Sequence, residues 1–164
     1  MDQIGKKAKI ASNFLTNLNI KKRNEVLRQF CFYLKIYSRK ILIENKKDIK
    51  KVKKINNSKI SRLKIDEDKI NDIIKAVNEI IKFKDPLGKT LSSWKRPNGI
   101  IINRVSIPIG VIGVIYESRP NVTSDVSALC FKTGNSVILR GGSEALNSNK
   151  IITKLFRKAL RMKK

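Results

Sequence analysis

The sequence contains no histidine and only two cysteines among its 164 residues. Without histidine, the chain has no imidazole for acid–base catalysis or for binding zinc. The two cysteines, Cys31 and Cys130, lie far apart and do not suggest a disulfide framework. We therefore predict neither a metal site nor a disulfide-stabilised fold.

Long apolar runs are missing as well. No apolar stretch approaches the roughly 20 residues that a transmembrane helix needs. The N-terminal residues MDQIGKKAKIASNF lack the apolar core of a signal peptide, so we expect a cytoplasmic location and no membrane contact. Hydrophobic residues make up 41% and charged residues 30% of the chain, which is typical of a globular domain with one hydrophobic core.

Acidic residues are scarce, which gives the chain a formal net charge of +24. Such a charge often accompanies binding to nucleic acids. However, the lysines are spread along the chain, with only a modest concentration at residues 46–54, and they accompany many Ile and Asn residues, as A/T-rich codons produce. We interpret the charge as a solvated surface and expect no nucleic-acid partner. The alternative is a small basic module that binds nucleic acid or protein, and a steep salt dependence of nucleic-acid binding would favour it.

The first half of the chain has the three- and four-residue apolar spacing of amphipathic helices. Four helices are predicted before the first strand. They span residues 3–18, a segment capped by Asn19 with an apolar stripe from Val26 to Ile41, residues 44–60 ending at Asn56–Ser58, and a segment that begins at Asp66–Asp68.

A turn sequence, Asp85-Pro86-Leu87-Gly88, separates these helices from two short extended runs. The runs, Thr90–Lys95 and Ile100–Ser106, are joined by Arg96-Pro97-Asn98-Gly99 and predict a β-hairpin. Isoleucine falls on both faces of the second run, which is unusual for an isolated solvated ribbon. A plain surface ribbon and an arm that contacts another subunit both fit this pattern.

The segment after the hairpin has the order strand, helix, strand and glycine-rich turn, as in nucleotide-binding α/β sheets. The first strand is apolar throughout, so we expect both of its faces to be buried. The predicted elements are a strand at Ile109–Tyr116, a helix capped by Asn121 or Thr123 that has Asp125 in its first turn and ends at Lys132, a break at Thr133-Gly134-Asn135, a buried strand at Ser136–Leu139, and a further helix that opens at Arg140–Glu144.

Four stretches of this segment resemble the gamma-glutamyl phosphate reductase family, also called glutamate-5-semialdehyde dehydrogenases, of the aldehyde dehydrogenase superfamily. They are Pro108–Val111, Val114–Thr123, Gly134–Asn135 and Ile138–Ala145. The resemblance extends more loosely over the whole chain, which covers only the first part of the family's length. It implies an α/β fold in which N-terminal helices precede the first strands of a Rossmann-like aldehyde dehydrogenase cofactor domain, with a protruding β-hairpin.

The resemblance also implies a domain organisation. Residues 1–84 would be a helical lead-in, residues 85–107 an oligomerisation arm, and residues 108–164 the first βαβα part of the NADP-binding domain, with the catalytic domain absent. A homo-oligomer is therefore expected. The family's nucleophilic cysteine would fall beyond residue 164, and we interpret Cys31 and Cys130 as core residues, so the segment alone should be inactive.

The activity implied by the resemblance is NADPH-dependent reduction of L-glutamyl 5-phosphate to L-glutamate 5-semialdehyde in proline biosynthesis. Asn121 falls where the family has an asparagine that stabilises the oxyanion, although local sequence alone favours a helix N-cap. Arg140 stands where related dehydrogenases place a lysine against the adenosine ribose, and Ser143 where NAD-preferring members have a glutamate. Arg140, Gly141, Gly142 and Ser143 would then bind NADPH; a simple turn and helix cap is the alternative.

Overall fold

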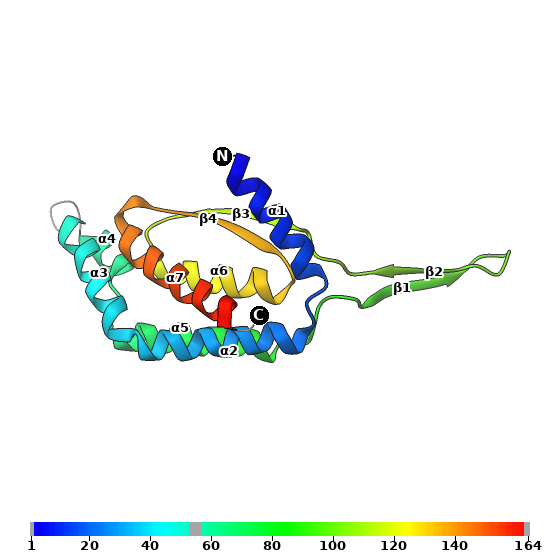
Figure 1. The fold of residues 1–164 in the computed structure, drawn as a ribbon, viewed down its shortest axis with the longest axis horizontal. Coiled ribbons are helices and arrows are strands. Elements are labelled where there is room, and N and C mark those ends of the chain that lie inside the picture. The colour runs from blue at the N-terminus through cyan, green and yellow to red at the C-terminus, as the bar shows by residue number, and fades with distance from the viewer. Residues whose placement is uncertain (1, 53–56, 163–164) are drawn as a thin grey trace.

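The computed structural model of the chain describes residues 2–52 and 57–162. Helices come first, followed by a hairpin that projects from the body and by a pair of strands with further helices (Figure 1). The elements are α1 (Asp2–Thr16), α2 (Ile20–Ile36), α3 (Ser38–Val52), α4 (Asn57–Leu63), α5 (Glu67–Lys82), β1 (Thr90–Lys95), β2 (Ile101–Val105), β3 (Val111–Tyr116), α6 (Pro120–Lys132), β4 (Ser136–Gly141), the 3-10 helix η1 (Ser143–Ala145) and α7 (Leu146–Met162).

The main core lies among the helices. Figure 1 shows α6 and α7 between the β3–β4 strands and the α2–α5 pair. Phe156 of α7 packs edge-on against Phe30 of α2 and Phe131 of α6, with ring centroids 4.9 and 5.7 Å apart. None of the described helices is both long and apolar enough to cross a lipid bilayer.

Two predicted helix starts are confirmed by their caps. The Asn19 side chain accepts a hydrogen bond from the Lys22 amide at 2.9 Å, and Asp66 accepts one from Lys69 at 3.0 Å. Each carboxamide or carboxylate satisfies a backbone donor that has no partner within its own helix. The local sequence was therefore enough to place the N-termini of α2 and α5.

The helix boundaries between residues 36 and 60 differ from the prediction. The apolar stripe that ends at Ile41 belongs to two helices, because the chain turns at Tyr37 (φ −97°, ψ 18°) and α3 begins at the next residue. Ile41 still faces the same core, with 1% of its surface exposed, so apolar spacing does not reveal the turn. The expected break at Asn57–Ser58 is wrong, since α4 begins at Asn57; Asn56 lies outside the described residues. Five helices, not four, precede the hairpin in the described ranges.

The start of α6 also differs from the prediction. The first helical residue is Pro120, Arg119 occupies the cap position, and no side chain makes a cap hydrogen bond. Proline favours the first helical position because its fixed φ suits a helix and its missing N–H costs nothing there. Neither Asn121 nor Thr123 is therefore a cap, and Asp125 lies beyond the first turn.

Strands β3 and β4 form the predicted parallel pair, joined by α6. Their register runs from Val111 opposite Ser136 to Tyr116 opposite Gly141. The expectation that both faces of β3 are buried is wrong for this chain, because Ile115 is 83% exposed. Helix α1 packs against β3 and β4, and helix α6 packs against β4, but this cover leaves part of β3 open. A parallel strand with an apolar sequence needs cover on both faces.

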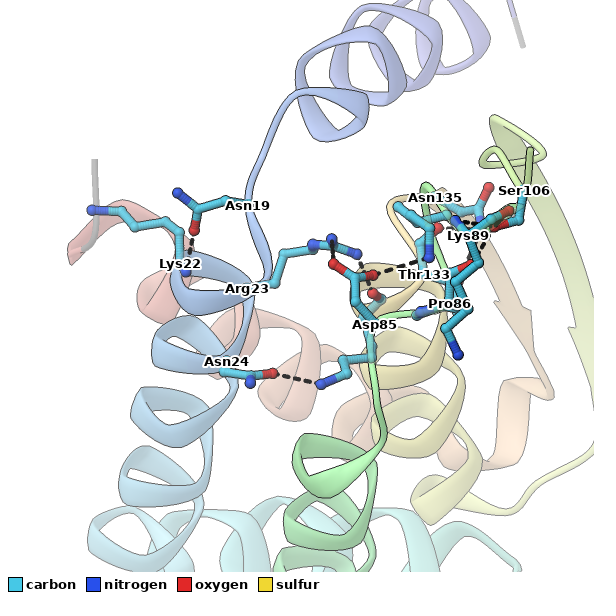
Figure 2. Close-up of polar contacts among 12 residues, drawn as sticks. Asn19, Lys22, Arg23, Asn24, Asp85, Pro86, Lys89, Ser106, Thr133 and Asn135 are labelled. Atoms are coloured by element: carbon cyan, nitrogen blue, oxygen red, sulfur yellow. Dashed lines mark hydrogen bonds and ion pairs between the residues drawn. The ribbon is translucent and has the colours of Figure 1, made fainter. Parts of the chain in front are cut away.

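The predicted hairpin is present and its base is held by polar contacts (Figure 2). Arg23 is buried and pairs with Asp85 at 2.7 Å, and it also donates to the carbonyl of Lys132. The Ser106 hydroxyl donates to the Pro86 carbonyl and so joins the two ends of the hairpin. These contacts fix the arm to α2 and to the end of α6.

Candidate functional site

The predicted site residues lie at one edge of the β3–β4 pair. Because the strands are parallel neighbours, the segments that leave them, residues 117–120 and 142–145, emerge on the same side. Ser118 Oγ donates to Glu144 Oε2 at 2.8 Å and joins these segments directly. Ligands of open α/β sheets bind outside the carboxyl ends of the strands, so this edge is the candidate site.

The two glycines after β4 are packed tightly against the end of β3. A Cβ atom on Gly141 would overlap the Asn149 side-chain amide and lie 2.8 Å from Cζ of Tyr116. A Cβ atom on Gly142 would lie 2.6 Å from Ser118 Oγ. Glycine at both positions therefore lets the glycine turn, defined here as residues 140–145, approach the neighbouring segment closely.

Arg140 and Ser143 are the exposed members of the glycine turn. Arg140 lines an open depression of about 900 Å³ that lies beside the end of β4 and the outer face of α7. None of its lining residues is acidic, and seven are basic: Lys40, Arg140, Lys150, Lys154, Arg157, Lys158 and Arg161. The concentration of positive charge favours an anionic ligand at this side of the turn.

Asn121 is the second residue of α6 and its side chain is exposed. Its amide nitrogen donates to Asp125 Oδ2 at 3.3 Å, one helical turn away. Burial raises the pKa of Asp125, and the hydrogen bond from Asn121 opposes this shift. The other carboxylate oxygen, Oδ1, is buried and makes no hydrogen bond. Asp125 thus orients the Asn121 amide, and its charged form lowers the stability of the fold because burial disfavours the charge.

Asp125→Asn is expected to raise the melting temperature at neutral pH. A carboxyl group with a raised folded-state pKa stabilises the fold fully below its unfolded pKa, and this stabilisation is lost as the pH rises through the folded pKa. The gain from the amide should therefore shrink as the pH falls and vanish below about pH 3.5. Melting curves across this range test it.

Asp66→Asn is the control, because hydrogen bonding to the Lys69 amide lowers the pKa of Asp66. In contrast to Asp125, the Asp66 carboxylate stabilises the fold at neutral pH, and this stabilisation is lost in acid. This variant should not gain stability at neutral pH. An Asp125→Asn gain that stays constant with pH would contradict the burial argument.

A half-buried chain of hydrogen bonds behind the site was not predicted from the sequence. Thr123, which is fully buried, donates to Asn149 Oδ1 at 2.9 Å and accepts from the Tyr116 hydroxyl at 2.6 Å, since its single proton is already used. Burial raises the pKa of Tyr116. The three residues come from β3, α6 and α7, and no local pattern links them. They hold the start of α6 against the first turns of α7.

Both cysteines lie in the core, as expected. Burial raises the pKa of Cys31 to about 11 and also raises that of Cys130. Each cysteine residue is 7% exposed, so neither thiol has the low pKa and access that a nucleophile needs. Among the described residues, no group of His, Cys, Asp and Glu side chains could hold a metal ion.

Comparison with known proteins identifies the relatives of this chain. No protein-family model matches it. A curated gamma-glutamyl phosphate reductase from Clostridium tetani (strain Massachusetts / E88) is 49% identical over 153 residues, which are 92% of this chain and 36% of that protein. The crystal structure of the Thermotoga maritima gamma-glutamyl phosphate reductase superposes with a TM-score of 0.93 at 40% identity, covering 96% of this chain and 38% of that one. The chain matches the N-terminal portion of gamma-glutamyl phosphate reductases.

The wider fold is also shared. The structure of a putative aldehyde dehydrogenase from Bacillus subtilis subsp. subtilis str. 168 covers 93% of this chain with a TM-score of 0.66 at 21% identity. The predicted resemblance and the predicted fold class are both confirmed: the chain has the N-terminal part of the aldehyde dehydrogenase-like fold. It spans 36% to 40% of the length of the first curated reductases it matches.

Proposed function

We propose that this chain is the N-terminal portion of an enzyme that reduces L-glutamyl 5-phosphate to L-glutamate 5-semialdehyde with NADPH, a step of proline biosynthesis. The observation that supports this most strongly is the 49% identity to a gamma-glutamyl phosphate reductase along 92% of the chain. Because the chain spans about two fifths of such proteins and its own thiols are buried, the activity requires further polypeptide.

The glycine turn suits the adenosine end of a nicotinamide cofactor, which supplies the hydride. Gly141 and Gly142 let the turn pack closely against the end of β3, and Arg140 and Ser143 lie exposed beside them. Serine at position 143 leaves room for a 2′-phosphate, where a carboxylate would repel it, and Arg140 offers a guanidinium to bind it. These features favour NADPH over NADH.

Asn121 is proposed to stabilise the oxyanion that forms on the substrate's acyl group. Its exposed amide lies at the same edge as the glycine turn and is held by Asp125. A positioned amide N–H can donate to an oxygen as negative charge develops on it. The chain would thus bind the cofactor and help to polarise the substrate, while the nucleophile comes from beyond residue 164.

The hairpin supports a homo-oligomer. It projects from the body, and it exposes large apolar side chains on both faces: Leu91, Trp94, Ile100, Ile101 and Val105. Their burial against a second copy of the protein would remove this apolar area from water. We propose that residues 85–107 form the oligomerisation arm, residues 1–84 the helical lead-in and residues 108–164 the first part of the cofactor domain.

A different function is favoured by one observation, the basic depression beside α7. Its seven Lys and Arg side chains would also suit a small module that binds nucleic acid. Such a module would bind short RNA or DNA with an affinity that falls steeply with salt. Binding of the 164-residue chain to a labelled oligonucleotide at several salt concentrations tests this alternative.

A chimaera tests the proposed function. In it, this chain replaces the matched part of the Thermotoga maritima reductase, which is 40% identical to it. We expect the chimaera to oxidise NADPH in the presence of glutamyl phosphate generated in situ, and the 164-residue chain alone to show no turnover. The parent enzyme is the positive control. A chimaera that folds and assembles like the parent but has no turnover would contradict the proposal.

A further inference from the structure

Helix α3 holds the start of α7 through a buried carboxylate. Asp48 is 1% exposed, and within the described ranges its hydrogen-bond donors lie at the first turn of α7. It accepts from the backbone and side-chain amides of Asn147 at 3.1 and 2.7 Å, and from the amide and hydroxyl of Ser148 at 2.8 and 2.7 Å. A buried charge is tolerated only when hydrogen bonds replace water, and here the helix dipole also favours it. Asp48 is therefore fully engaged with α7.

Asn45 lies one turn earlier on the same face of α3 and extends this contact. It is also 1% exposed; its amide donates to the Leu63 carbonyl at 2.8 Å and to Ser148 Oγ at 3.0 Å. Its carbonyl accepts from the amide of Ile65 at 2.8 Å. Asn45 thus joins the α4–α5 connection and the start of α7 to a single helix.

The glycine turn is attached to α3 by apolar packing as well. Ala145, at the end of η1, is fully buried in a small cluster with Val52 of α3 and Leu63 of α4. On its opposite side the turn meets Ser118 and Tyr116 at the end of β3. The turn is therefore fixed between β3 and α3, and α3 comes about 100 residues earlier in the chain.

This arrangement has a consequence for how a nucleotide is bound. In many α/β sheets a phosphate of the cofactor binds to the free amides at a helix N-terminus. In α7 the amides of Asn147 and Ser148 already donate to Asp48, so they are not available to a ligand. Recognition then depends on Arg140, on Ser143 and on where the turn places them.

We propose that Asp48 and Asn45 are positioning residues for the cofactor. They fix the position of the glycine turn relative to α3, and the Asp48 carboxylate occupies the start of α7, where a cofactor phosphate would otherwise bind. The inference rests on the proposed function, because it assumes that the turn binds the adenosine end of NADPH. It assigns α3 a part in cofactor affinity, although Asp48 and Asn45 contact the start of α7 and not the exposed face of the glycine turn.

Asp48→Asn tests the structural half of the proposal in the 164-residue chain by hydrogen–deuterium exchange. The variant keeps the shape but replaces one acceptor oxygen with a donor, so we expect faster exchange throughout residues 140–148 and little change in α2 and α5. Asp72→Asn is the matched control, since Asp72 is exposed and, among the described residues, forms its ion pair with Lys75 of its own helix. Faster exchange confined to residues 147–148 would overturn the proposal.

Cofactor binding tests the other half in the chimaera. Asp48→Asn should weaken NADPH and adenosine 2′,5′-bisphosphate together by roughly tenfold, with kcat at saturating NADPH nearly unchanged, because a misplaced turn affects binding and not the chemical step. Ser148→Ala, which removes one donor, should act in the same direction more weakly and serves if Asp48→Asn fails to fold. A lower melting temperature with unchanged affinities would show a merely structural role. If the unmodified chimaera binds neither nucleotide, the proposed function fails, and the exchange experiment still decides whether α3 sets the turn.

Discussion

Asn121→Ala in the chimaera is expected to lower kcat about a hundredfold, the usual effect of losing one oxyanion donor. Stability should hardly change. The side chain is exposed, is not the helix cap, and makes one long hydrogen bond to Asp125 at 3.3 Å, so the free energy of unfolding should stay within about 0.5 kcal/mol. Steady-state kinetics at saturating NADPH and denaturant unfolding measure the two quantities.

Asn71→Ala is the matched control, because it removes an exposed asparagine from helix α5, which Figure 1 shows on the far side of α6 and α7 from the β3–β4 pair. It should leave kcat unchanged. The opposite pattern for Asn121→Ala, with normal turnover and a clear loss of stability, would show that Asn121 serves the fold only. A loss of turnover that accompanies aggregation would be identified by the unfolding curve and by the oligomeric state.

Ser143→Glu is expected to reduce the preference for NADPH over NADH by roughly tenfold or more. The new carboxylate would lie where the 2′-phosphate is proposed to bind and would repel it, whereas the free ribose hydroxyls of NADH could donate hydrogen bonds to it. Ser143 is exposed at the start of η1, where a negative charge is tolerated electrostatically, so folding should not suffer. The ratio of kcat/KM for the two cofactors is the quantity to measure.

Ser143→Gln separates charge from size. Glutamine has nearly the shape of glutamate without its charge, so the cofactor ratio should stay much closer to that of the unmodified chimaera. If Ser143→Glu and Ser143→Gln change the ratio equally, bulk and not charge is responsible. If neither changes it, Ser143 is part of a helix turn and the 2′-phosphate is recognised elsewhere.

Short-range patterns were enough to predict much of the architecture. The caps at Asn19 and Asp66, the hairpin around Pro97-Asn98-Gly99 and the strand–helix–strand unit each depend on residues within one element or turn. The candidate residues within the motif from Val114 to Ala145, Asn121 and Arg140–Ser143, each follow one of the two predicted strands. Such features follow from backbone preferences and from spacing that repeats every two or every 3.6 residues.

The sequence by itself therefore determined the family resemblance, the order of most elements and which segments lie at the site. Only the tertiary structure decided that α2 ends at Ile36, that Ile115 is exposed, and that Tyr116, Thr123 and Asn149 form one chain of hydrogen bonds. It alone revealed that Asp48 holds the start of α7. The physical reason is that burial and polar pairing depend on groups that can lie more than 100 positions apart, and no local spacing records which of them will meet.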